Sequence, residues 1–112
     1  MKKITQTMKN SEIYMLAIGF LKNFNGETTL PIKVNFYLTK NKQYFVRLGA
    51  QIDEMRKKIG ENPDKEQVKK ELQNLSELEQ EVSFYQVDLE DFGNVDLSME
   101  QIEILQFMIK EE

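Results

Sequence analysis

Cationic and aromatic side chains alternate along the segment 33–47. Lys33, Tyr37, Lys40, Tyr44 and Arg47 are separated by four, three, four and three residues. This spacing places them in one stripe on the surface of an α-helix. Tyrosine rings can stack on a nucleobase while lysine and arginine bind phosphate, so the stripe predicts a site for a small anionic, nucleotide-like ligand. The alternative is a solvated flank, in which long side chains cover the helix core with their apolar stems.

The helix that must position this stripe is expected over residues 30–59. Its apolar positions alternate by four and three residues, as in a coiled coil or another helix packed along a helix: Val34, Leu38, Asn41, Phe45, Leu48, Ile52, Met55 and Ile59. Asn41 is the polar exception in this row. It is either a buried amide that sets the register or a ligand contact at the edge of the stripe.

The predicted helix is too long for a compact chain of this size. At 1.5 Å per residue it would measure about 45 Å, whereas a compact domain of this length has a diameter of about 34 Å. The overhanging part of the apolar row needs a partner, and a second copy is the simplest one. We therefore expect a homo-oligomer, with a seam formed by Phe45, Leu48, Ile52, Met55 and Ile59.

Shorter elements are expected on both sides of the long helix. They are an arm or short edge strand over 1–10, a helix over 11–25, a short helix over 63–76, a strand over 82–89 and a helix over 98–110. The fold class is then α+β, mainly helical, in a single domain over 1–112. The strand at 82–89 cannot satisfy its own backbone, so its partner is the N-terminal arm or another subunit.

Capping signals and apolar spacing support these boundaries. The expected signals are Ser11 for the first helix, Thr28 or Thr29 with Pro31 for the long helix, Gly60 for its end, Asn62 with Pro63 for the third, and Ser98 with Gln101 for the last. The first helix should bury Ile13, Leu16, Ala17, Phe20 and Phe24, and the last should bury Met99, Ile102, Leu105 and Ile109.

The chain lacks the side chains and motifs on which most catalytic sites depend. The chain has no cysteine and no histidine, and it lacks a glycine-rich phosphate loop and a G-x-S-x-G motif. The acidic segment 88–99 resembles a calcium loop only weakly, because Phe92 and Met99 stand at its fifth and twelfth positions, where oxygen ligands are needed. We expect a non-enzymatic protein without cofactor or metal, and an acidic connection at 88–99 rather than a loose Mg²⁺ or Ca²⁺ site.

Charge is distributed unevenly along the chain. Residues 30–58 carry seven basic and two acidic side chains, whereas residues 77–112 carry one and eleven. The two segments either dock, within one chain or between chains, or present solvated faces that prevent aggregation. The acidic third and a pI near 5.0 make duplex nucleic acid an unlikely ligand.

The apolar run 13–21 follows Lys2, Lys3 and Lys9, as the core of a signal peptide would. Ser11 and Glu12 interrupt this approach, and no small-residue cleavage site follows. The run is also shorter than the roughly 20 residues that span a bilayer. We therefore expect a globular helix, no membrane partner and a cytoplasmic protein.

Three segments together give the chain a resemblance to small uncharacterised proteins encoded by tailed bacteriophages and prophages. They are the run Leu30–Asn41, the strand beginning at Glu81-Val82 and the closing helix Met99–Ile109. The resemblance covers roughly residues 12–110 and lies in layout rather than in a chemical motif, so it transfers no functional residue. It implies a phage accessory protein in the bacterial host cytoplasm. Such a protein would bind a host factor or sequester a nucleotide-like ligand to inhibit host defence, or alternatively serve as a structural or assembly component that oligomerises through the long helix.

Overall fold

The computed structural model describes residues 2–24, 30–93 and 95–110. The protein is mainly helical with a small sheet, an α+β fold. Its elements, in chain order, are β1 (Lys2–Lys9), α1 (Asn10–Asn23), α2 (Ile32–Gly60), α3 (Lys65–Glu77), β2 (Glu79–Asp88), η1 (Leu89–Phe92), α4 (Met99–Leu105), η2 (Gln106–Met108) and β3 (Ile109–Lys110).

The partner of β2 is the N-terminal arm of the same chain. β1 and β2 pair antiparallel over eight residues each, with Lys2 opposite Gln86 and Lys9 opposite Glu79. The arm is thus an edge strand, one of the two alternatives expected for it. On the other edge of β2, Val87 pairs in parallel with Ile109 of β3.

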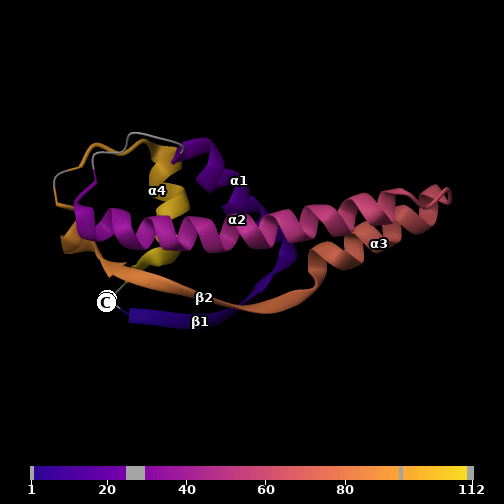
Figure 1. Ribbon diagram of the computed structural model, residues 1–112, viewed down its shortest axis with the longest axis horizontal. Coiled ribbons are helices and arrows are strands. Elements are labelled where there is room, and N and C mark those ends of the chain that lie inside the picture. Colours follow the sequence, from indigo (N-terminus) through magenta and orange to yellow (C-terminus); the bar gives the residue numbers. More distant parts are fainter. Residues whose placement is uncertain (1, 25–29, 94, 111–112) are drawn as a thin grey trace.

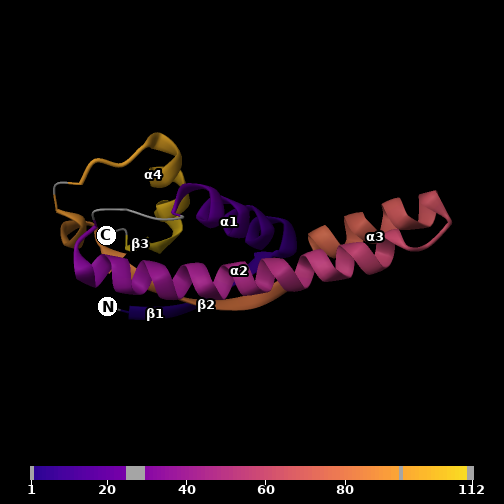
Figure 2. The same ribbon diagram turned by 45° about the horizontal axis from the view of Figure 1, so that its top comes forward.

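The long helix α2 is the central element of the molecule. Figures 1 and 2 show β1 and β2 running along one side of α2, while α1 and α4 lie on another. Helix α2 therefore packs against α1, β2 and α3 of its own chain. It does not pack along a single helix, as it would in a coiled coil. The predicted helix 30–59 agrees with the observed Ile32–Gly60 to within two residues at either end.

The far end of α2 extends beyond the sheet, as its length predicts, and the molecule measures 53 × 26 × 20 Å. The chain itself covers part of this overhang, because α3 folds back along α2 as the second arm of a helical hairpin (Figures 1 and 2). Ile59 is half-buried there, but Met55 remains 52% exposed, so the described part of the chain leaves this position of the apolar row uncovered. Homo-oligomerisation through this end stays a prediction.

Four phenylalanines from different elements meet at the centre of the core. The ring centroid of Phe45 on α2 lies 6.2 Å from that of Phe20 on α1, 5.9 Å from that of Phe84 on β2 and 5.3 Å from that of Phe107 in η2. Phe45 has no exposed surface. Aromatic contacts at these separations add to the free energy of burial, so this cluster joins the helical layer to the sheet.

The apolar row of α2 departs from its predicted spacing at the fifth turn. Gly49, not Leu48, is the fully buried residue there, and Leu48 is half-buried. A β-carbon at Gly49 would lie only 2.6 Å from the β-carbon of Ala17 on α1. The absence of a side chain therefore allows the two helices to cross closely, a role that a search for apolar residues overlooks.

Two predicted N-caps are each replaced by a residue two positions away, Ser11 by Lys9 and Asn62 by Asp64. Helix α1 begins at Asn10 instead of Ser11, and the Glu12 carboxylate accepts a hydrogen bond from the Lys9 backbone N–H at 3.1 Å. Helix α3 is capped by Asp64, whose side chain accepts from the backbone N–H groups of Glu66 and Gln67. The predicted cap Asn62 instead accepts from the N–H of Asp64 at 3.0 Å. The predicted caps Thr28 and Thr29, like the end of the first helix at residue 25, lie outside the described residues.

The last helix is shorter than predicted. Its capping box is confirmed, since Ser98 and Gln101 exchange side-chain and backbone hydrogen bonds. The helix ends at Leu105, however, and the chain continues through η2 into β3. Met99 is 74% exposed and Ile102 is also exposed, so their assignment to the core face is wrong, whereas Leu105 is fully buried.

Candidate functional site

A basic hollow opens between α2 and the antiparallel strands β1 and β2. It has a volume of about 260 Å³. Its lining residues come from β1, α2 and β2 and are Lys3, Lys40, Asn41, Gln43, Tyr44, Arg47, Ser83 and Tyr85. Three of them are cationic, two are tyrosines and none is acidic, so the hollow offers positive charge and aromatic surface together.

Helical and strand periodicities bring these residues together. Lys40, Gln43, Tyr44 and Arg47 are spaced by three, one and three residues, so they share one side of α2. Alternation along β2 places its two lining residues on one face of the strand. Lys3 joins them from β1, because it lies directly opposite Tyr85 in the strand register.

Asn41 forms the floor of the basic hollow and ties α2 to β2. Its Oδ1 accepts a hydrogen bond from the backbone N–H of Tyr85 at 2.9 Å, and its Nδ2 donates to the carbonyl oxygen of the same residue at 2.9 Å. The side chain is only 1% exposed. The Asn41 carboxamide thus binds the backbone groups of Tyr85 that a neighbouring strand would otherwise bind. These two hydrogen bonds are also the partners that the predicted buried amide requires.

Tyr44 supports the same edge of β2 one turn further along. Its hydroxyl oxygen accepts a hydrogen bond from the backbone N–H of Ser83 at 3.2 Å. The Ser83 hydroxyl in turn lies 2.9 Å from that of Thr5 on β1. The Tyr44 ring is therefore anchored at its polar end while its face borders the hollow.

The cations of the basic hollow lie over aromatic rings. Lys3 Nζ is 5.5 Å from the centroid of the Tyr85 ring, and the guanidinium carbon of Arg47 is 5.9 Å from the centroid of the Tyr44 ring. Among the described residues, no carboxylate forms an ion pair with Lys3, Lys40 or Arg47. Their charge is balanced only by solvent and weak cation–π attraction, so it remains available to an anion.

Two members of the predicted stripe lie outside the hollow. Lys33 Nζ is 3.5 Å from Asp91 Oδ1, an ion pair at the start of α2. Tyr37 is half-buried, and its ring centroid lies 5.0 Å from that of Tyr85. The structure therefore brings together Lys40, Asn41, Tyr44 and Arg47 but leaves Lys33 and Tyr37 in structural contacts.

Four lining residues were missed by the sequence analysis: Lys3, Gln43, Ser83 and Tyr85. Ile4 and Met8 are the apolar residues in 3–8, but Gln6 between them breaks the alternation, so the local pattern was too weak a signal to place Lys3 on a strand face. The register that sets it opposite Tyr85 joins the two ends of the chain. Helical periodicity within one segment contains no information on such a pairing.

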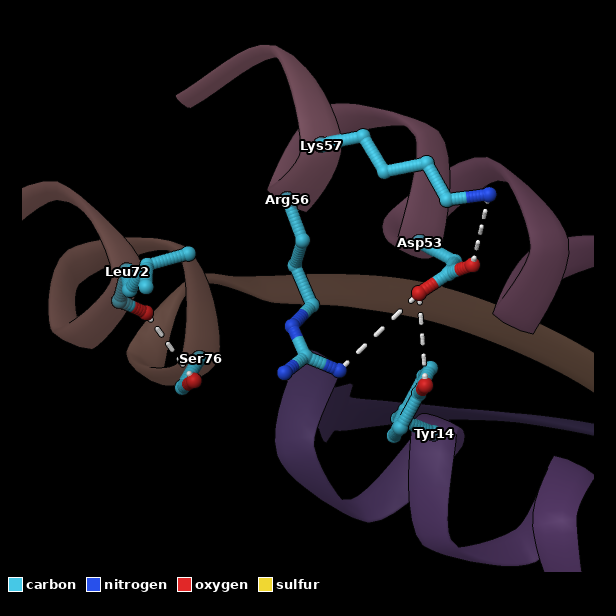
Figure 3. Close-up of polar contacts among 6 residues, drawn as sticks. All are labelled: Tyr14, Asp53, Arg56, Lys57, Leu72 and Ser76. Carbon is cyan, nitrogen blue, oxygen red and sulfur yellow. Dashed lines mark hydrogen bonds and ion pairs between the residues drawn. The ribbon is translucent and has the colours of Figure 1, made fainter. Parts of the chain in front are cut away.

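Another hollow, of about 400 Å³, lies where α1, α2 and α3 meet, but its one charged lining side chain, Arg56, is already paired with Asp53. Asp53 accepts a hydrogen bond from the Tyr14 hydroxyl at 3.4 Å and lies 4.0 Å from Arg56 and 3.6 Å from Lys57 (Figure 3). Arg56 also lies over the Tyr14 ring at 5.1 Å. The two contacts of Tyr14 link α1 to α2, and Arg56 is engaged by both Asp53 and the Tyr14 ring.

Comparison of the chain with protein-family models, with curated proteins and with solved structures gives no match. In the described part of the chain, no group of three or more acidic side chains is placed to hold a metal ion. No helix within those residues combines the length and the apolar character needed to cross a membrane.

Proposed function

We propose that the protein binds a small anionic, nucleotide-like ligand in the basic hollow and acts without catalysis, as an accessory protein that sequesters the ligand. The observation that supports this is the set of three cations, Lys3, Lys40 and Arg47, that share one hollow with two tyrosines and no carboxylate. Phosphate oxygens are suited to such cations, and a base is suited to the tyrosine faces. A role in phage inhibition of host defence is the setting that the sequence resemblance implies.

The test is a titration with ATP and GTP, followed by calorimetry and by thermal unfolding. A ligand at a hundred times its dissociation constant should stabilise the folded protein by about 2.7 kcal/mol, because it binds only the folded state. The double variant Lys40→Gln, Arg47→Gln is expected to bind at least about ten-fold more weakly, since charge-assisted hydrogen bonds are lost.

The matched control is Lys58→Gln. Lys58 is exposed on the same helix, eleven residues beyond Arg47 and hence about 16 Å along the axis. Its replacement removes one positive charge outside the hollow and should leave affinity unchanged. Failure of both nucleotides to bind the wild type, or an equal loss in the control, would contradict the proposal.

The second candidate is a structural or assembly component that forms a homo-oligomer. It is supported by large apolar side chains on the outer face of α1, where Met15, Ile18 and Leu21 are exposed at three-residue spacing, and by the exposed Met55 on α2. Sedimentation equilibrium at micromolar concentration should then give a mass above that of one chain. The double variant Met15→Ser, Met55→Ser should shift the equilibrium toward the monomer, and a monomeric wild type would exclude this candidate.

A further inference from the structure

A second hollow adjoins the basic hollow along α2. It has a volume of about 420 Å³ and is lined by Ile32, Asn35, Phe36, Thr39, Lys40 and Gln43. Lys40 and Gln43 line both hollows. The two depressions are therefore neighbours on one face of the helix, and one extended ligand can contact both.

The second hollow exposes apolar surface that the fold does not use. Phe36 is 55% exposed and Ile32 is 88% exposed. The Phe36 ring is held in place by an edge contact with Tyr37, with ring centroids 5.2 Å apart. An aromatic ring that is more than half exposed is a suitable platform on which a planar base can stack.

The polar side chains of the second hollow are neutral. Asn35, Thr39 and Gln43 carry amide and hydroxyl groups, which can both donate and accept hydrogen bonds. Among the described residues, none of these side chains has a hydrogen-bond partner within the protein. They suit the edge of an uncharged heterocycle, whereas the cations of the basic hollow suit phosphates.

Lys40 connects the two hollows. Its Nζ lies 5.0 Å from the centroid of the Phe36 ring, and its side chain also lines the basic hollow. A phosphate in the basic hollow would attract the ammonium group away from Phe36, since an anion binds a cation more strongly than a ring face does. The ring face that Lys40 now covers would then be open to a base.

We propose that both hollows form one composite site for a linear nucleoside polyphosphate, with its phosphates in the basic hollow and its base stacked on Phe36. This inference rests on the proposed function and specifies the ligand and its orientation. From Phe36 to Arg47 the helix rises about 16 Å, which accommodates a base at one end and a phosphate chain at the other.

The test compares ATP with inorganic tripolyphosphate, which has the phosphate chain but no base. The wild type should bind ATP about ten-fold more tightly, because stacking of a base on an aromatic ring contributes a factor of this order. Phe36→Ala should remove this preference and leave tripolyphosphate affinity unchanged. Lys40→Gln, Arg47→Gln should weaken both ligands.

Met55→Ala is the matched control, since it also removes a half-exposed apolar side chain from α2. It should retain the preference for ATP. Equal affinity of the wild type for ATP and tripolyphosphate, or a preference that survives Phe36→Ala, would overturn the composite site and leave the basic hollow as an anion site. Absence of binding by either ligand would overturn the proposed function itself.

Discussion

Replacing Asn41 by leucine is expected to lower the free energy of unfolding by about 2–4 kcal/mol, because the N–H and the C=O of Tyr85 would both lose their partner. Leucine has the same branching and the same number of heavy atoms as asparagine but a larger volume, so no cavity would form and overpacking would add to the loss of the hydrogen bonds. Asn41 is almost fully buried, and water is therefore a poor substitute. Urea unfolding followed by circular dichroism measures the change directly.

The variant Asn41→Asp distinguishes the contributions of the two hydrogen bonds that Asn41 makes with Tyr85. A carboxylate can still accept from the Tyr85 N–H, but it cannot donate to the carbonyl oxygen 2.9 Å away. Burial and this repulsion should raise the pKa of the introduced acid above its unfolded value, and protonation restores a donor. The destabilisation should therefore be largest at neutral pH and decrease as the pH falls through that raised pKa. Equal stability of wild type and Asn41→Leu would show that β2 does not depend on Asn41.

Phe45→Ala is expected to cost about 3–5 kcal/mol, the range for removing a fully buried aromatic side chain from a core. The cost should lie near the top of that range because the Phe45 ring contacts rings from α1, β2 and η2 at once. The surrounding elements cannot all move inward to fill the cavity. Denaturant unfolding gives the change in free energy.

The matched control for Phe45→Ala is Phe36→Ala on the same helix. Phe36 is more than half exposed, so its removal should change stability by no more than about 0.5 kcal/mol. This control also shows that Phe36→Ala remains folded when it is used to test base stacking. Comparable losses in both variants would mean that the aromatic cluster is not the main support of the core.

The long helix was predictable from sequence because its apolar period continues over many turns. The first helix was predictable for the same reason, and Ile13, Ala17, Phe20 and Phe24 are buried as expected. The length of the last helix was overestimated because its apolar spacing continues past Leu105, although the backbone there changes to η2 and then to β3. Periodicity identifies a helical face but not the point at which tertiary contacts end the helix.

The candidate site was only partly predictable. Lys40, Tyr44 and Arg47 lie on one helix face, so local spacing was sufficient to group them. Lys33 fits the same spacing but is paired with Asp91, which comes from a distant segment. Phe36, one residue before the predicted stripe member Tyr37, was overlooked because its exposure depends on which face of α2 the sheet covers.

The pairing of β1 with β2 has a consequence for the order of events during synthesis. β1 leaves the ribosome first, but Lys2 pairs with Gln86, so most of the chain must follow before the strand finds its partner. The helices α1, α2 and α3 depend on contacts closer in sequence and can form earlier. Lys3 and Tyr85 thus come to lie opposite each other only when β1 pairs with β2. A nascent chain that ends before β2 would have the helical stripe but no hollow, and any ligand-binding activity would arise only after β2 has been made.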